Sequence, residues 1–211
     1  MRHAQVRYFE GVHPHEVQLT EAGRHQAAAA RDALQDVRFD RVVTSGLPRT
    51  IETARTVAPY AELESNEALR EIESGELRGR SEAEVQAMMS GAFAHNVTLD
   101  SRFLGGESHR ELYERVVPAV SSVLDDPSWD VALLVLHGGV NRAIISWALL
   151  GEPSFLGGFE QAPGCVNVLD VDGEGRFIVR AVNHTPYDPV HADAPRETTM
   201  EQLWREYLER K

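Results

Sequence analysis

The amino-acid sequence predicts one three-layer α/β domain. Short apolar segments alternate along the chain with longer amphipathic ones, which is the pattern of strands alternating with helices. Residues 131–136 are apolar throughout and too few for a helix, so they fit a strand covered on both faces, as in a parallel sheet. The 211 residues are enough for one domain with a full core, and no repeat or linker divides them.

Caps, periodicity and turn residues predict the individual elements. Strands are expected at residues 41–44, 61–64, 131–136, 165–171 and 176–182, with a hairpin turn at 172–175. Helices are expected at residues 20–34, 47–57, 81–93, 108–124, 141–150 and 198–209.

Composition limits the possible partners. The chain is 42% hydrophobic and 26% charged, as in a soluble globular protein, and it has no apolar run of membrane-spanning length and no leader. A net charge of −12 disfavours nucleic acid and anionic membranes, because their phosphates would be repelled. The single cysteine, Cys165, cannot form an internal disulfide and is interpreted as a packing residue. We therefore expect a cytoplasmic protein.

Two histidines and two arginines stand out because of their positions. His137 and Ser45 each follow a predicted strand, and the carboxyl ends of the strands are where sites form in open α/β sheets. Gly138 follows His137 and allows the backbone to approach a ligand at the start of the next helix, where N–H groups favour an anion. Arg2 and Arg49 are suited to bind phosphate oxygens bidentately.

These residue types are suited to phosphoryl chemistry. An imidazole beside guanidinium groups loses affinity for protons, so a nitrogen lone pair stays free to attack phosphorus. The leaving alkoxide then needs a proton donor, such as a partly buried carboxyl group.

The chain carries several short motifs in a fixed order: Arg2-His3-Ala4, Leu19-Thr20-Glu21-Ala22-Gly23, Ser45-Gly46-Leu47-Pro48-Arg49-Thr50-Ile51-Glu52-Thr53-Ala54, Leu69-Arg70-Glu71-Ile72-Glu73-Ser74-Gly75 with Gly79, Gly105-Gly106-Glu107-Ser108 and His137-Gly138-Gly139. Together they span about three quarters of the chain. In this order they resemble the histidine phosphatase superfamily, whose members are phosphoglycerate mutase-like.

The resemblance implies both a fold and a set of roles. The fold is a three-layer sandwich with a mixed, mostly parallel sheet and helices on both faces, as one domain over residues 1–211 with a lid at about 73–106. It implies that His3 is the nucleophile that becomes phosphohistidine, and that Glu71 is the general acid and base. Arg2, Arg49, His137 and Gly138 would then form the phosphate pocket, with His137 also catalytic. No metal or organic cofactor is implied.

The chain departs from the family pattern in three places. Ala4 replaces the usual glycine, and Phe9 stands where many members carry a phosphate-binding asparagine. Only Met1 precedes the arginine–histidine pair, so the first strand of the family is expected to be missing or truncated. That strand lies mid-sheet in the family, and its loss would expose two hydrogen-bonding edges. We expect either that the natural chain starts upstream or that another segment fills the gap.

Alternatives remain open for several residues. Glu73 and Glu76 lie near Glu71 and offer the same chemistry. The segment His13-Pro14-His15 makes a poor zinc site and is expected at the mouth of the pocket. Met88, Met89, Phe93 and Phe103 fit a substrate lid, a core or a dimer contact, whereas Arg70, Arg78, Arg80 and Arg102 fit the lid or a solvated face. His109, His184 and His191 are expected in loops or at the surface.

The predicted function is hydrolysis of small soluble phosphate monoesters, and the resemblance makes a homodimer the expected assembly. Phosphoglycerate mutase-type phosphoryl transfer is the nearer alternative. Mutases that resemble this family usually carry a longer insert and an asparagine at the position of Gly139, so hydrolysis is favoured. A non-catalytic phosphate-binding module that retained the fold is the alternative of a different class.

Overall fold

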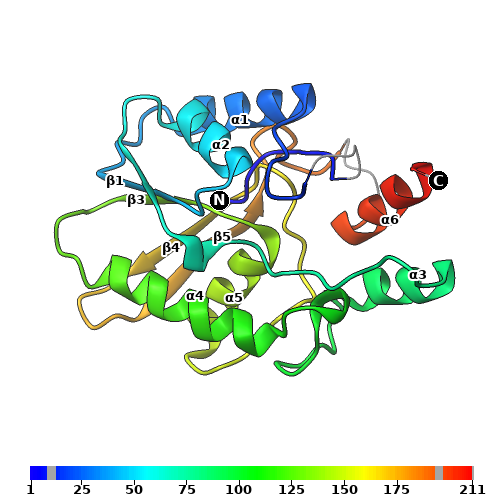
Figure 1. Ribbon diagram of the computed structural model, residues 1–211. Coiled ribbons are helices and arrows are strands. Elements are labelled where there is room, and N and C mark those ends of the chain that lie inside the picture. Colours follow the sequence, from blue (N-terminus) through cyan, green and yellow to red (C-terminus); the bar gives the residue numbers. More distant parts are fainter. Residues whose placement is uncertain (9–12, 193–196, 211) are drawn as a thin grey trace.

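The central sheet is covered by helices on both faces. The computed structural model describes residues 1–8, 13–192 and 197–210. Figure 1 shows α1 and α2 on one face of the sheet and α4 and α5 on the other, as the sequence predicts. The elements in chain order are α1 (Glu21–Ala33), β1 (Arg41–Thr44), α2 (Pro48–Val57), β2 (Leu63–Ser65), η1 (Glu67–Leu69), α3 (Glu82–Gly91), η2 (Phe103–Gly105), α4 (His109–Leu124), β3 (Ala132–Val135), α5 (Gly138–Leu150), β4 (Val166–Val171), β5 (Phe177–His184) and α6 (Thr199–Glu209).

The strands form a mixed, mostly parallel arrangement. β1 pairs in parallel with β2 on one side and with β3 on the other, which gives the order β2-β1-β3. β4 and β5 pair antiparallel across the predicted turn at residues 172–175. Because β1 and β3 are parallel, their carboxyl ends lie at the same edge of the sheet, which brings the residues after Thr44 and after Val135 together.

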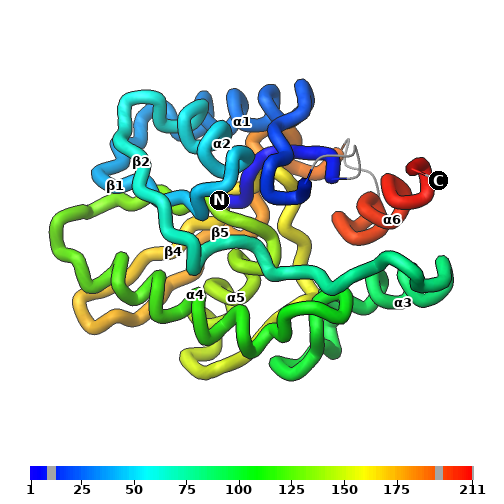
Figure 2. The backbone as a smooth tube through the Cα atoms, in the orientation of Figure 1, coloured from blue at the N-terminus to red at the C-terminus, as the bar shows by residue number. Residues whose placement is uncertain are grey.

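The first three residues lie in the middle of the fold, between β3 and Cys165. Leu136 N donates to Met1 O (2.9 Å) and His3 N donates to Leu136 O (2.8 Å), which makes a parallel bridge beside β3. On the other side Arg2 N donates to Cys165 O (2.9 Å). Figure 2 shows this N-terminal segment inside the molecule. The predicted gap is therefore filled in part, over the length that positions Arg2 and His3.

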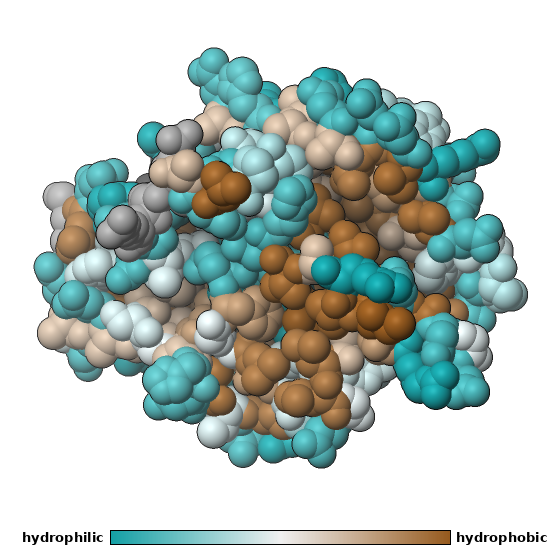
Figure 3. Space-filling model, turned by 180° about the vertical axis from the view of Figure 1, so that it is seen from behind, coloured by the Kyte–Doolittle hydropathy of each residue, from teal (hydrophilic) through white to brown (hydrophobic). Residues whose placement is uncertain are grey.

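A cavity lies beside this short segment. It has a volume of about 550 Å³ and is lined by residues of β3 and β4 and by side chains of α4 and α5, among them Leu134, Ile144 and Val168. Figure 3 shows the opposite side of the molecule from Figure 1, where apolar side chains gather around a hollow. A full-length strand between β3 and β4 would occupy such a space.

The strand residues alternate between two apolar cores. Val43 and Leu136 join the cluster formed with α4 and α5, whereas Val42 and Leu133 join the cluster formed with α1 and α2. Successive side chains of a strand point to opposite faces, so a strand of continuous apolar residues can serve both cores. The interpretation of residues 131–136 as a strand covered on both faces is therefore confirmed for β3, whereas Val131 precedes the strand and is 40% exposed.

Helix α5 begins at Gly138, with His137 as its N-cap, which confirms the prediction that Gly138 lies at the start of this helix; hydrophobic periodicity alone placed the helix only from Asn141. One local prediction was wrong. His109 was expected in a loop or at the surface, but it is 1% exposed and its ring lies 4.0 Å from that of Phe155, centroid to centroid. His109 is the first residue of α4, and the packing of its ring against Phe155 decides its burial. In the part of the chain that the structure describes, no helix has the length and hydrophobicity of a membrane span.

Candidate active site

His3 is held in one tautomer at the end of the N-terminal segment. Its Nδ1 lies 2.8 Å from the carbonyl oxygen of Ala4, and a carbonyl can only accept, so Nδ1 carries the proton. The lone pair is therefore on Nε2, which lies 3.4 Å from the hydroxyl of Tyr8. Ala4, which replaces the family's glycine, is fully buried and its N–H donates to Thr53 Oγ1 (3.1 Å).

The environment of His3 keeps it unprotonated. Burial, followed by the positive charges of Arg49 and Arg2, lowers the pKa of His3 well below its usual value. Burial, followed by the positive charge of Arg49, also lowers the pKa of His137 well below its usual value. Both rings are consequently neutral at physiological pH, and Nε2 of His3 is available as a nucleophile.

His137 faces His3 across the carboxyl edge of the sheet. The two ring centroids are 5.1 Å apart, with an interplanar angle of 65°. Ser45, which follows β1, lies with its Oγ 2.8 Å from His137 Nε2. Nδ1 of His137 is buried and has no hydrogen-bond partner in the described structure. The parallel pairing of β1 with β3 thus brings together two positions that are far apart in the sequence.

Arg2 and Arg49 each bring a buried guanidinium to the site. Arg49, in the first turn of α2, donates to Pro14 O (2.9 Å), while Arg2 donates to Gln161 O and to Thr199 Oγ1 (3.1 Å for the latter). Nε of each arginine is buried without a partner among the described residues. Such an orphan donor carries the full cost of lost solvation, about 1–3 kcal/mol. The two guanidinium groups, beside the unpartnered Nδ1 of His137, form a site suited to an anion.

Glu71 lies at the N-terminus of α5. Gly139 N donates to its carboxyl oxygens at 3.0 and 3.3 Å, and Ile72 N donates to Oε1 at 3.0 Å. A helix N-terminus favours an anionic group, and at α5 the carboxyl group of Glu71 accepts a hydrogen bond from one of the free N–H groups of the first turn. Glu73 also lines the neighbouring cavity, whereas Glu76 is not among its lining residues. Of the three candidate carboxylates, Glu71 is therefore the one held at the start of α5.

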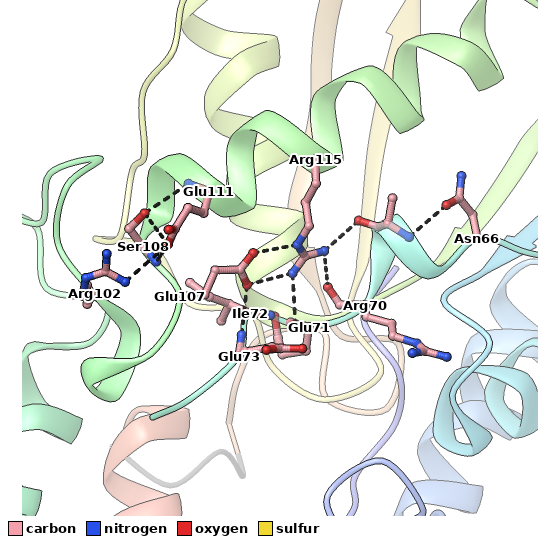
Figure 4. Close-up of polar contacts among 11 residues, drawn as sticks. Asn66, Arg70, Glu71, Ile72, Glu73, Arg102, Glu107, Ser108, Glu111 and Arg115 are labelled. Carbon is pink, nitrogen blue, oxygen red and sulfur yellow. Dashed lines mark hydrogen bonds and ion pairs between the residues drawn. The ribbon is translucent and has the colours of Figure 1, made fainter. Parts of the chain in front are cut away.

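Arg115 of α4 holds the backbone around Glu71 in place through hydrogen bonds to its carbonyl groups (Figure 4). Its Nη1 donates to the carbonyls of Ala68 and Arg70 at 2.7 and 2.8 Å, and its Nη2 donates to Glu71 O at 3.2 Å. Arg115 is also paired bidentately with Glu107, at 2.7 and 2.9 Å. Bidentate, partly buried pairs of this kind hold geometry well. Arg115 is therefore a positioning residue for the segment that carries Glu71.

The absence of a side chain at Gly139 is needed for this arrangement. A Cβ on Gly139 would lie 2.7 Å from Glu71 Oε1 and 2.9 Å from Ile72 Cγ2, both closer than Cβ contacts allow. We predict that Gly139→Ala displaces Glu71 and lowers kcat for phosphate ester hydrolysis by roughly 10²-fold, because small displacements of a catalytic group cost that much.

The matched control for this substitution is Gly91→Ala at the end of α3, where a Cβ would meet nothing within 4 Å. Activity and the urea midpoint should stay unchanged in this control. Full activity in Gly139→Ala would show that Glu71 does not need its observed position.

The other sequence-predicted residues separate into two groups. Gly138, His13 and His15 line a cavity at the site, together with Met89, Phe93 and Phe103 from the predicted lid segment. The cavity lining does not include Met88, Arg70, Arg78, Arg80 or Arg102. Arg70 and Arg102 form ion pairs with Glu67 and Glu111 instead, which fits the solvated-face alternative. Phe9 lies outside the described residues.

Sequence reasoning missed three contributors to the site. Tyr8 brings its hydroxyl close to His3 and lies with its ring 5.6 Å from the Arg49 guanidinium carbon. Thr199, at the start of α6, contacts Arg2. Arg115 sits within an amphipathic helix. None of the three belongs to a recognisable motif, and only the proximity of Tyr8 to His3 along the chain could have signalled a role.

Comparisons with known proteins agree with this geometry. Residues 1–184 match the profile of the histidine phosphatase superfamily (branch 1). The "Probable phosphoglycerate mutase GpmB" of Salmonella paratyphi A is 30% identical over 182 residues, which cover 84% of each chain. Among solved structures, "Mycobacterial hydrolase 1" superposes with a TM-score of 0.69 at 26% identity, covering 87% of this chain and 96% of that one. The mycobacterial glucosyl-3-phosphoglycerate phosphatase gives 0.67 at 27% identity, with coverages of 86% and 95%.

The family match extends across both ends of the site, from the segment that carries His3 to the strand and helix that flank His137. The resemblance that the short motifs suggest is thus borne out over most of the chain. The protein belongs to the histidine phosphatase superfamily.

Proposed function

We propose that this protein is a phosphatase that hydrolyses small phosphate monoesters through a phosphohistidine intermediate on His3. The observation that carries the proposal is the set of orphan donors around a neutral imidazole. Arg2 Nε, Arg49 Nε and His137 Nδ1 are all buried and unpartnered in the described structure. A phosphoryl group would accept from both guanidinium nitrogens, and from His137 Nδ1 in the tautomer that carries the ring proton there, and would offset the desolvation cost of these groups.

In the proposed first step, the lone pair on His3 Nε2 forms a bond to phosphorus. The ester P–O bond breaks, and the leaving oxygen takes a proton from the Glu71 carboxyl group. In the second step, the Glu71 carboxylate accepts a proton from water. The water oxygen bonds to phosphorus, the P–N bond breaks, and its electron pair returns to Nε2. Arg2, Arg49 and the N–H groups at Gly138 stabilise the negative charge on the equatorial oxygens in both steps.

Mutase-type transfer is the second candidate, because a relative at 30% identity carries the name of a phosphoglycerate mutase. The two activities differ in the acceptor of the phosphoryl group. A hydrolase releases inorganic phosphate from 3-phosphoglycerate or from p-nitrophenyl phosphate, whereas a mutase returns the group to a second hydroxyl. Hydrolysis needs fewer bound anions at once and is the proposal here.

A cytoplasmic location is part of this proposal. Cys165 is a free, buried cysteine, and its thiol contacts Gln161 Oε1 at 3.6 Å. A buried thiol with no disulfide partner is typical of a reducing compartment.

The test uses p-nitrophenyl phosphate with the intact protein. We expect steady release of p-nitrophenol at mildly acidic to neutral pH, together with a covalent phosphoenzyme that survives an alkaline quench and is lost in acid, as a phosphorus–nitrogen bond would be. The phosphoryl group should map to the N-terminal peptide that contains His3. Release of p-nitrophenol without such a phosphoenzyme, or no release at all, would refute the proposal.

A further inference from the structure

A second space adjoins the phosphate site. It is a cavity of about 750 Å³ whose lining includes Arg2, Arg49, Glu71 and Gly138, so it opens directly onto the proposed phosphate position. Beyond these residues most of its wall is apolar: Leu47, Ile72, Leu77, Met89, Phe93, Phe103, Leu104, Met200 and Leu203. A cavity of this volume accommodates a small organic group.

The wall is built from two parts of the chain that meet above the site. One part is the segment around α3 and η2, which contributes Met89 and Phe103. The other is α6, which contributes Met200 and Leu203 and lies beyond residue 184, where the family match ends. Figure 1 shows α6 beside α3, away from the central sheet. The α6 part of this wall therefore lies outside the residues that match the family, whereas the part from α3 and η2 lies inside them.

The cations near the cavity are already engaged. Arg142 is 3% exposed, and its donors reach the carbonyls of Phe159 (2.7 Å), Gly138 (3.3 Å) and Gly157 (3.4 Å). Its guanidinium carbon also lies 4.3 Å from the ring centroid of Phe93. Three of its five N–H donors are thus bound to carbonyls and its face is covered by an aromatic ring, so Arg142 offers a second anion less than a free guanidinium would.

The remaining charges are also unfavourable for a second anion. Glu71 and Glu73 add carboxylates to the lining. The other basic lining residues, His13, His15 and Arg210, are exposed and belong to the rim. A carboxylate or second phosphate placed in this cavity would lose water, while the buried cations of the described lining are already used: Arg2 and Arg49 by the proposed phosphate, and Arg142 by backbone carbonyls.

We infer that the group attached to the phosphate in the substrate of this protein is uncharged and mainly apolar, such as an alkyl chain or an aryl ring. The inference rests on the proposed function for the phosphate end, and it adds the chemical class of the other end. Burial of the apolar group against Met89, Phe103 and Leu203 supplies the binding energy, while Arg2 and Arg49 hold the phosphate.

The test is a chain-length series in two assays. The first measures Kd for ethyl-, butyl- and hexylphosphonate, which cannot be hydrolysed. The second measures kcat/KM for the corresponding n-alkyl phosphates. The leaving alcohols have nearly equal acidity, so the chemical step stays constant while the buried apolar area grows. We expect both affinity and kcat/KM to rise roughly fourfold for each added methylene. With 3-phosphoglycerate, kcat/KM should lie at least about tenfold below that of butyl phosphate.

Two variants on α6 test whether the dependence of affinity on chain length arises from the cavity. Leu203→Asn places an amide in the apolar wall and should flatten the chain-length slope while leaving ethylphosphonate affinity nearly unchanged. Leu208→Asn is the matched control, because Leu208 is on the same helix, is 37% exposed and does not line the cavity. This control should keep the wild-type slope.

The outcomes separate this inference from the proposed function. A flat slope in both assays, or a preference for 3-phosphoglycerate over butyl phosphate, would overturn the inference even if turnover proceeds through His3. A steep slope for the phosphonates with no turnover would support an apolar cavity and refute the phosphatase instead. An equal loss of slope in Leu203→Asn and Leu208→Asn would also count against the inference, since it would place the effect outside the cavity.

Discussion

His3→Asn is expected to lower kcat for p-nitrophenyl phosphate hydrolysis by roughly 10³-fold or more, because removal of a covalent nucleophile leaves only binding and electrostatic stabilisation. Asparagine is chosen because its amide nitrogen can replace Nδ1 as the donor to Ala4 O, while nothing replaces the lone pair on Nε2. The measurement is steady-state turnover, together with the yield of phosphoenzyme, which should be zero.

The control for this variant is His25→Asn. His25 lies on α1 and is exposed, so the same substitution there removes an imidazole far from the phosphate site. Wild-type activity is expected. If His3→Asn kept more than about a tenth of the wild-type kcat while folded, the nucleophile would have to be another group.

The same variant should change how stability depends on pH. The pKa of His3 is lowered in the folded state, whereas the unfolded chain takes up a proton near the usual value of 6.5. As pH falls below 6.5, the unfolded state therefore binds more protons, and the free energy of unfolding decreases by at most about 1.4 kcal/mol per pH unit for this residue. Urea unfolding at pH 7 and pH 5 should show a smaller decrease in His3→Asn than in the wild type. His137 follows the same rule and keeps part of the slope.

Arg49→Met is expected to lower kcat/KM for phosphate monoesters by roughly 10²–10³-fold, which is the typical cost of losing one preorganised donor to a developing anion. Arg49 is 2% exposed, and its Nε has no partner in the described structure, so its charge is directed at the site and is poorly screened. Methionine keeps much of the side-chain volume in the first turn of α2 and so limits the structural damage.

Two further variants test whether the activity depends on the guanidinium group of Arg49. Arg49→Lys keeps the charge but not the planar fork, so it should recover only part of the lost activity. Arg55→Met, an exposed position in the last turn of the same helix, should leave kcat/KM unchanged. Equal activity of Arg49→Met and Arg55→Met would show that Arg49 does not bind the phosphoryl group.

The arrangement of helices and strands was largely predictable, and the reasons are local. The caps Thr20, Ser81, Ser108 and Thr198 each mark the start of a helix in the structure. The turn at residues 172–175 joins β4 and β5 as its composition indicates. Such signals depend on a few neighbouring residues, so they survive without knowledge of the rest of the fold. Periodicity placed α5 only from Asn141, because glycine has a low helix propensity, whereas the position of Gly138 directly after a strand and His137 indicated the earlier start.

The contacts that support the site were not predictable in this way. Arg115 holds the backbone near Glu71 from another helix, and Thr199 reaches Arg2 from the far end of the chain. Tyr8 contacts His3 through a side chain that carries no motif. Each of these contacts depends on how distant elements pack, and packing is set by complementary shapes that no short window of sequence records.

The sequence by itself determined the family, the parallel sheet and the residues proposed to handle phosphate, because each depends on motifs, caps and hydrophobic periodicity read along the chain. Only the tertiary structure decided that Met1–His3 lies between β3 and Cys165, that the His3 and His137 rings face each other 5.1 Å apart, and that α6 closes an apolar cavity beside them. The physical reason is that these features arise from long-range pairing and burial, whose free energy is shared among residues far apart in the sequence.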